Sequence, residues 1–327
     1  MKASRIAELL KQLVSIRRPV FIWGPPGVGK SSLVHQVAEQ GNRQLIDIRA
    51  SLLDPTDLRG LPYVESGVAQ WSVPAFLPRD IDSDGILFFD ELNAAPPLVQ
   101  ASLYQLTLDR RIGDYVLPPR WTIVGAGNRA EDRSVVFRMP AALANRFIHL
   151  EFEVDTEEWL AWALDHQIHP AVRGFIRTRR QLLFDMSHAD RAFPTPRSWE
   201  MLSEALVALR SPQAAADLFS GIVGEAAGIE FLAYLSQSLT EEQIQAVIED
   251  PQGATLPSAL GELYALVSYL SARAKESKVS QAAGVLLGRL TPEMAVMLAR
   301  DVLRANKAFA RNSGYLAFVR DHGSLLV

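Results

Sequence analysis

Short apolar runs alternate with longer amphipathic stretches over the first 154 residues. A strand buried on both faces of a parallel sheet is apolar at nearly every position, whereas a surface helix repeats its apolar positions every three or four residues. The short runs predict strands at residues 20–23, 45–48, 86–90, 121–125 and 149–154. Amphipathic stretches at 6–13, 31–40 and 98–108 predict helices. This alternation indicates the α/β class, with a parallel five-stranded sheet covered by helices on both faces.

The strand pattern stops near residue 155. Beyond it, helical periodicity dominates, and Pro, Gly, Ser and Asp separate the stretches 156–165, 171–183, 198–209, 214–235, 260–273 and 292–309. We therefore expect two domains, an α/β core over residues 1–154 and an all-helical part over residues 155–327.

A short insertion separates the second and third predicted strands. Within residues 60–78, two apolar stretches flank the polar turn Glu65-Ser66-Gly67, which predicts a β-hairpin. Tyr63 and Trp71 on this hairpin are available as aromatic contacts for a partner. The alternative is that the hairpin has only a packing role.

The most informative motif follows the first predicted strand. Residues 24–31 read GPPGVGKS and fit the template G-x-x-x-x-G-K-[ST] of a phosphate-binding loop between a strand and a helix. Such a loop presents backbone N–H groups and the positive end of a helix dipole to an anion. We expect a nucleoside triphosphate to bind here, with Lys30 reaching the outer phosphates; the binding residues are Gly24, Pro25, Pro26, Gly27, Val28, Gly29, Lys30, Ser31 and Ser32.

Polar side chains follow the third and fourth predicted strands. Asp90 and Glu91 end the run ILFFDE, and Asn128 comes directly after the fourth strand. In an open parallel sheet, ligands bind beyond the carboxyl ends of the strands. We expect Asp90 and Ser31 to hold Mg²⁺, Glu91 to polarise the water that attacks the γ-phosphate, and Asn128 to hydrogen-bond that phosphate or the water.

Two arginines complete the candidate chemistry. Arg146 precedes the fifth strand, and Arg197 begins a helical stretch after two prolines in FPTPRSWE. A guanidinium group suits phosphate oxygens and can be supplied by a neighbouring subunit. For each arginine taken alone, a surface salt bridge is the simpler interpretation, and it is their order in the chain that favours a role at the nucleotide.

Composition narrows the function classes. The chain has 327 residues, no cysteine and a net charge of −4, so disulfides, thiolate metal sites and cysteine nucleophiles are excluded and there is no general basic field for nucleic acid. Charged residues interrupt the apolar positions near the N-terminus, and no run approaches the ~18 apolar residues of a membrane span. We therefore expect no signal peptide, no membrane span and a cytoplasmic location.

Weaker signals leave alternatives open. His166 and His169 form H-x-x-H without a third nearby ligand, so a metal site is disfavoured. The basic run at Arg173, Arg177, Arg179 and Arg180 is typical of a solvated helix face. Whether Arg110, Arg111 or Arg138 acts at a subunit interface is left open by the pattern.

The order of these motifs resembles the AAA+ ATPases, and more closely their MoxR-type branch. The branch resemblance rests on Asp54-Pro55-Thr56-Asp57-Leu58, the insertion after it, the segment Ala-Asn-Arg-Phe around Arg146, and Pro194-Thr195-Pro196-Arg197-Ser198-Trp199. It covers residues ~18 to ~210. By this resemblance, Asp90 and Glu91 belong to Walker B, Asn128 is sensor 1, Arg146 is an arginine finger and Arg197 is sensor 2.

The resemblance further implies a helical lid after the core, with residues 60–78 as the helix-2 insert and residues 111–117 as a hairpin before sensor 1. It implies ATP and Mg²⁺ as cofactors and a homo-oligomeric, hexameric ring that remodels or activates a protein client, with a VWA-domain protein as the expected partner. The alternative is a nucleic-acid motor, such as a branch-migration or loading ATPase, against which the acidic composition argues. A nucleotide-dependent scaffold with little turnover is a third class, disfavoured by the intact Glu91 and Asn128.

Overall fold

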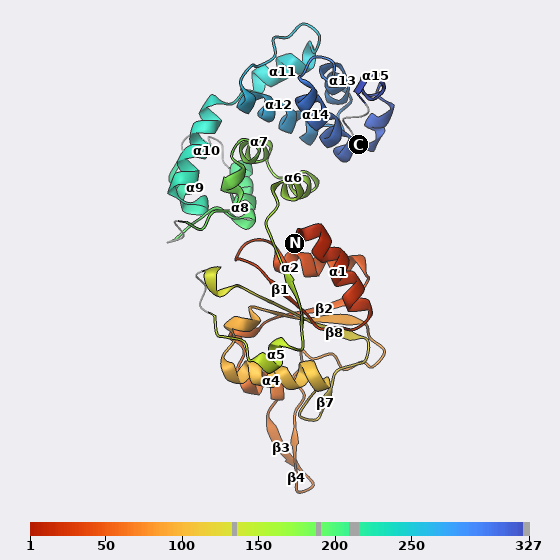
Figure 1. Cartoon of the computed structure of the whole chain (residues 1–327), viewed down its shortest axis with the longest axis vertical. Coiled ribbons are helices and arrows are strands. Elements are labelled where there is room, and N and C mark those ends of the chain that lie inside the picture. Colours follow the sequence, from red (N-terminus) through yellow and green to blue (C-terminus); the bar gives the residue numbers. More distant parts are fainter. Residues whose placement is uncertain (133–135, 188–190, 209–215, 323–327) are drawn as a thin grey trace. The chain divides into compact units, whose positions relative to one another are not determined.

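The computed structural model describes residues 1–132, 136–187, 191–208 and 216–322. The chain divides into two compact units, Met1–Asp155 and Thr156–Val327 (Figure 1). The expected domain boundary, after residue 154, lies one residue before this division.

The first unit is built on a five-stranded sheet in which all neighbouring strands are parallel. Its order is β2-β5-β8-β1-β9. The strands are β1 (Val20–Trp23), β2 (Gln44–Arg49), β5 (Gly85–Asp90), β8 (Trp121–Gly127) and β9 (Ile148–Glu151). The predicted fold class is therefore confirmed.

Two strand ends differ from the prediction by more than one residue. β8 continues to Gly127, beyond the expected end at residue 125, and β9 stops at Glu151 instead of residue 154. The N–H of Phe152 still donates to the carbonyl of Trp23, at 2.7 Å. Beyond Trp23 the neighbouring strand β1 turns into the glycine-rich loop, so the residues after Phe152 have no strand to pair with.

Helices cover both faces of this sheet. Figure 1 shows α1 (Ala3–Ser15) and α2 (Lys30–Gln40) on one face, and α4 (Pro97–Asp109) and α5 (Ala141–Ala144) on the other. Because side chains alternate along a strand, Phe21 and Phe89 point into the core beneath α4 and α5, where they join Leu103 and Leu143. The short elements that complete the unit are η1 (Ala50–Leu52), α3 (Pro55–Arg59), η2 (Leu92–Ala94) and η3 (Ala130–Asp132).

Two small hairpins project from this unit. The expected hairpin within residues 60–78 is confirmed as β3 (Pro62–Glu65) and β4 (Val68–Trp71), and the one at 111–117 as β6 (Arg111–Ile112) and β7 (Tyr115–Val116). Ser66 and Gly67 both have positive φ, as the tight turn of a two-residue hairpin requires. The N–H of Trp71 donates to Asp114 Oδ2 at 3.3 Å, which connects the two hairpins.

The second unit is entirely helical in the part that the structure describes. Its helices are α6 (Thr156–Asp165), α7 (Pro170–Thr178), η4 (Arg180–Leu183), α8 (Pro196–Ala208), α9 (Ala216–Val223), α10 (Glu225–Gln237), α11 (Glu241–Glu249), α12 (Leu260–Ala272), α13 (Ser277–Leu286), α14 (Pro292–Ala305), η6 (Lys307–Arg311) and α15 (Ser313–His322).

Several of these boundaries depart from the predicted stretches. The stretch 214–235 is two helices, α9 and α10, because Gly224 has a φ of 87° that breaks the helix. The sequence pattern also missed α11, α13 and α15. Residues 209, 214 and 215, where two expected helices end or begin, lie outside the described residues.

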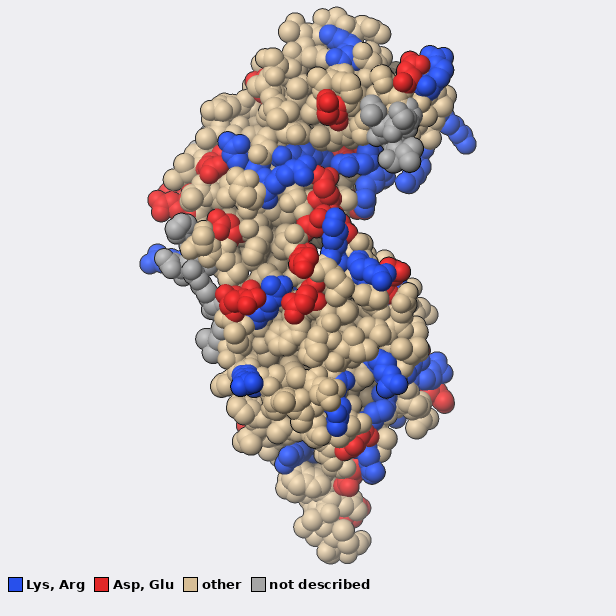
Figure 2. Space-filling model, in the orientation of Figure 1, with Lys and Arg blue, Asp and Glu red and all other residues tan. Residues whose placement is uncertain are grey.

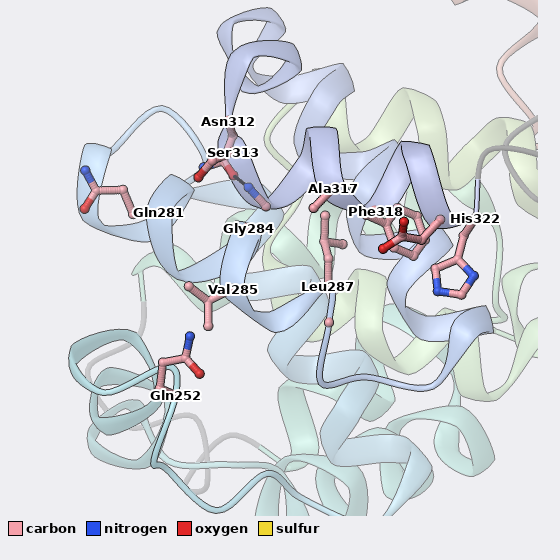
Figure 3. A pocket seen from close by; sticks show the side chains of 13 residues that line it. Gln252, Gln281, Gly284, Val285, Leu287, Asn312, Ser313, Ala317, Phe318 and His322 are labelled. Atoms are coloured by element: carbon pink, nitrogen blue, oxygen red, sulfur yellow. Dashed lines mark hydrogen bonds between the residues drawn. The ribbon is translucent and has the colours of Figure 1, made fainter.

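The C-terminal helices line an open pocket of about 420 Å³. In Figure 3, Gln281 and Val285 of α13 lie on one side of it, and Phe318 and His322 of α15 lie on another. No residue of the phosphate loop lines this pocket.

The structure corrects the predicted role of the arginines in α7. Arg173 and Arg177 are only 1% and 6% exposed, so they are not a solvated face. Arg173 donates to the carbonyls of Ile168 and Ser268, and Arg177 forms an ion pair with Asp301 of α14. Burial, followed by the charge of Arg177, lowers the pKa of Arg173 to about 9. The sequence pattern could not show this, because Asp301 lies far along the chain.

We expect Asp301→Ala to lower the free energy of unfolding by about 3–5 kcal/mol, since it leaves the Arg177 guanidinium buried without its counter-ion. The matched control is Asp165→Ala, which removes the carboxylate from an exposed pair with Arg304 and should cost no more than about 1 kcal/mol. Urea unfolding followed by far-ultraviolet circular dichroism measures both. Equal, small losses for the two variants would contradict the assignment.

Candidate nucleotide-binding site

The glycine-rich loop connects the end of β1 to the start of α2. Gly27 and Gly29 have φ values of 75° and 99°, which residues with a side chain rarely adopt. At Gly24, an added Cβ would lie 3.0 Å from the Cβ of Phe152. The first turn of α2 carries no acidic residue, so its free N–H groups and its dipole favour an anion in the loop.

Lys30 is the first residue of α2 and its side chain turns back over the loop. It is 8% exposed, and its Nζ donates to the carbonyls of Gly24 and Pro25 at 2.6 and 2.8 Å. It also donates to Asn128 Oδ1 at 2.9 Å. A buried ammonium group requires such acceptors. Two residues that the sequence places far apart, Lys30 and Asn128, are therefore in direct contact.

The two expected magnesium ligands also meet. Ser31 Oγ donates to Asp90 Oδ2 at 2.6 Å, and Asp90 Oδ1 accepts from the N–H of Glu91 at 2.9 Å. Asp90 ends β5, so its carboxylate lies at the carboxyl edge of the sheet. A hydroxyl and a carboxylate are the hard oxygen donors that Mg²⁺ prefers. The residues present thus fit the ion, with Ser31 and Asp90 as the groups that would hold it.

Glu91 has an unusual backbone and a partner that the sequence reasoning missed. Its φ of 54° lies in the left-handed region, which a residue with a side chain adopts only at a cost. Its Oε2 accepts from Ser51 Oγ at 2.6 Å. Ser51 follows β2, and Arg49 of β2 pairs with Asp90 of β5. The sequence could have indicated this contact, because Ser51 directly follows β2, the strand that pairs with β5.

Arg146 and Arg197, the two predicted arginines, lie in different units of the chain. Arg146 follows α5, is half-buried, and has its guanidinium carbon 5.9 Å from the centre of the Tyr104 ring. Arg197 is an exposed residue in the first turn of α8, in the helical unit. The roles of both remain predictions.

The structure also gives the contacts of Arg110 and His169, which the sequence singled out as interface and metal candidates. Arg110 donates to the carbonyls of Pro118 and Trp121 at 2.7 and 2.8 Å, so its guanidinium group is bound within its own chain. Arg111 and Arg138 are exposed. His169 caps α7 by accepting from the N–H of Ala171. Burial lowers its pKa, with a further contribution from Arg173.

The described residues include neither a His/Asp/Glu metal cluster nor a membrane-spanning helix. No group of three or more His, Asp or Glu side chains there is arranged to hold a metal ion. Among the described helices, none has the length and apolar character needed to cross a bilayer.

Residues 19–147 match the family described as AAA domain (dynein-related subfamily). The protein MoxR of Methylorubrum extorquens is 28% identical over 149 residues, which is 44% of this chain and 43% of that protein. Midasin of Giardia intestinalis is 30% identical over 172 residues, covering 50% of this chain and 4% of midasin.

The Holliday junction branch migration complex subunit RuvB of Chlorobium luteolum is 27% identical over 163 residues, which is 44% of this chain and 42% of that protein. The chain thus spans less than half of the length of these three relatives. Among solved structures, NtrX from Brucella abortus in complex with ADP is 15% identical, with a TM-score of 0.45 over 99% of this chain and 68% of that one. The RuvB motor of Thermotoga maritima is 20% identical, with a TM-score of 0.39 over 82% and 80%.

The family match and the sheet that carries the loop and the paired carboxylates define residues 19–147 as an AAA+ ATPase domain. Its similarity to MoxR proteins, which extends to MoxR of Paracoccus denitrificans at 28% identity over 51% of each chain, assigns it to the MoxR-type branch.

We expect Ser51→Ala to raise the basal rate of ATP hydrolysis by up to about tenfold, the factor that corresponds to a hydrogen bond of about 1.4 kcal/mol. The hydroxyl of Ser51 donates to Glu91 Oε2 and so occupies a carboxylate oxygen that would otherwise be available to the attacking water. Phosphate release at saturating ATP measures the rate. A large fall would show instead that Ser51 holds Glu91 in its working position.

Proposed function

We propose that this chain hydrolyses ATP, with Mg²⁺, in a homo-oligomeric ring of six subunits, and that it uses this energy to remodel or activate a protein client in the cytoplasm. The proposal includes a VWA-domain protein as the expected partner. One observation carries it: beyond the carboxyl ends of the neighbouring strands β5, β8 and β1, Lys30 donates to Asn128, Ser31 donates to Asp90, and Asp90 accepts from the N–H of Glu91.

The residues at this edge can divide the work of hydrolysis among them. The loop amides and Lys30 bind the phosphate chain, and the Lys30 ammonium offsets negative charge on the outer phosphates. Glu91 accepts a proton from, and orients, the attacking water, while Asn128 fixes the γ-phosphate or that water. Mg²⁺ held by Ser31 and Asp90 would supply charge neutralisation at the phosphate oxygens.

We propose that Arg146 and Arg197 also act on the bound nucleotide. Arg146 acts on the nucleotide of the adjacent subunit, and Arg197 acts as the sensor of the helical unit. Support for Arg146 comes from the position of its guanidinium group, whose carbon lies 5.9 Å from the centre of the Tyr104 ring in a half-buried side chain. A planar guanidinium group suits bidentate binding of phosphate oxygens.

The similarity to RuvB favours a second candidate, a motor that acts on nucleic acid. The two proposals differ in what stimulates turnover. We would compare the ATPase rate with added duplex DNA and with a co-purified VWA-domain protein. Stimulation by DNA alone would replace the protein client with nucleic acid.

We expect Glu91→Gln to keep nucleotide affinity but to reduce hydrolysis by at least about 100-fold, because the amide keeps the shape of the side chain and loses the charge that polarises water. Lys30→Ala should instead weaken binding, since it removes the ammonium group from the loop. Calorimetric titration with ATP and a phosphate-release assay separate the two effects. Turnover of the Glu91 variant at the wild-type rate would refute the catalytic assignment.

We expect Arg146 to act on the neighbouring subunit. Rings made only of Arg146→Ala subunits should hydrolyse ATP poorly, yet mixing them with Lys30→Ala subunits should restore activity, because some interfaces then pair an intact loop with an intact arginine. Arginine fingers are worth on the order of 10³–10⁵ in rate. Arg5→Ala, at an exposed arginine of α1 that pairs with Glu8, serves as control. Activity that is independent of concentration in a strictly monomeric protein would contradict the proposal.

The β3–β4 hairpin is the surface that we propose to contact the client. Tyr63 and Trp71 are 45% and 38% exposed, and Glu65 is the only charged residue between 60 and 78. The end of the hairpin is accordingly almost entirely tan in Figure 2. Exposed aromatic side chains give a large contact area at low entropic cost.

We expect Tyr63→Ala with Trp71→Ala to leave basal hydrolysis intact and to abolish its stimulation by the client. A packing role for Trp71 predicts a lowered melting midpoint and a lost basal rate, so thermal melting is measured beside the stimulated rate. Unchanged stimulation in a stably folded double variant would exclude the hairpin from client contact.

A further inference from the structure

The buried side-chain amide of Asn93 connects the segment after the paired carboxylates to Asn128. Asn93 lies in η2, two residues after Glu91, and is 3% exposed. Its Nδ2 donates to the main-chain carbonyl of Asn128 at 2.7 Å. The segment that follows the paired carboxylates is therefore bonded directly to the residue whose side chain contacts Lys30.

The end of β8 is held from two sides. The carbonyl of Gly127 accepts from the N–H of Gly24, the first residue of the phosphate loop, at 3.2 Å. The next carbonyl, that of Asn128, accepts from Asn93. Two consecutive carbonyls thus connect β8 to the phosphate loop and to the carboxylate segment. Movement of Asn128 relative to Glu91 requires the bond from Asn93 to break.

The carbonyl group of the Asn93 side chain lowers the stability of the fold. Its Oδ1 is buried and has no hydrogen-bond partner among the described residues. A buried polar atom without a partner destabilises a protein, and a leucine of similar shape would avoid this loss. Gly127 makes room for the amide, since a Cβ at that position would overlap Asn93 Oδ1. Packing alone does not explain an asparagine here.

We infer that Asn93 is a positioning residue that fixes Asn128 relative to Glu91 and Lys30, and that Gly127 is required to admit it. This inference rests on the proposed hydrolysis of ATP at the site. The Asn93 side chain donates to the main-chain carbonyl of Asn128 and acts through that backbone. Errors of about 1 Å in the placement of a catalytic group cost on the order of 100-fold in rate.

The same unit contains a matched control. Gln100 of α4 is fully buried, its Nε2 donates to the carbonyl of Ala95 at 3.0 Å, and its Oε1 lacks a hydrogen-bond partner among the described residues. It therefore has the same pattern of one satisfied and one unsatisfied amide group as Asn93. Its bond, however, is to the turn that precedes its own helix and does not reach the candidate site.

The test compares Asn93→Leu with Gln100→Leu in the full chain. We expect Asn93→Leu to keep ATP affinity and the melting midpoint and to lower kcat by at least about tenfold, because only the placement of Asn128 is lost. Gln100→Leu should melt at or above the wild-type midpoint and keep the wild-type kcat. A wild-type kcat for Asn93→Leu would overturn the inference. So would a lowered midpoint together with lost affinity, which would make Asn93 a structural residue.

A second variant approaches the same contact from the other side. Gly127→Ala retains every polar group but places a methyl group where Asn93 Oδ1 lies, so it should also lower kcat. In an Asn93→Ala background the same substitution should have less effect, since the overlap with the Asn93 amide is then removed and only the contact with the Phe21 ring, at 2.9 Å, remains. Additive losses would count against the inference. A wild-type chain that does not hydrolyse ATP would refute the proposed function instead, so the two failures are distinguishable.

Discussion

The parallel pairing of β8 with β1 and with β5 is the constraint on which the candidate site depends. Parallel strands end at the same edge of a sheet, so the loop after β1, the carboxylates after β5 and the amide after β8 are brought together by main-chain hydrogen bonds alone. The side-chain contacts of Lys30 with Asn128 and of Ser31 with Asp90 follow from that register. Without it, these residues would be unrelated points along the chain.

Buried polar groups in the two units have different relations to stability. In the helical unit, Arg177 is compensated by Asp301, and removing one partner leaves a charge in an apolar core. At the edge of the sheet, Lys30 is held by carbonyl and amide oxygens, and Glu91 adopts a left-handed backbone conformation. Such arrangements cost stability and are common where a protein binds a ligand or carries out chemistry.

The sequence predicted the sheet and most of the residues at its edge, because both depend on local patterns. Apolar runs mark the buried strands, and the loop motif has a fixed spacing in the chain. It did not predict the partners of Glu91 and Asn128. Ser51 and Asn93 act through single hydrogen bonds between segments that are distant in sequence, and an isolated serine or asparagine gives no periodic signal. The burial of Arg173 was missed for the same reason, since two of its acceptors, Ser268 and Ser271, lie on α12.

The central claim is that the edge formed by β1, β5 and β8 binds ATP and Mg²⁺. The most direct test is a crystal structure of the chain grown with ADP, beryllium fluoride and MgCl₂. The account predicts that the Nζ of Lys30 leaves the carbonyls of Gly24 and Pro25 for the phosphate mimic, and that Mg²⁺ is held through Ser31 and Asp90. Nucleotide bound elsewhere, for example in the pocket between α13 and α15, with Lys30 still on the loop carbonyls, would contradict it.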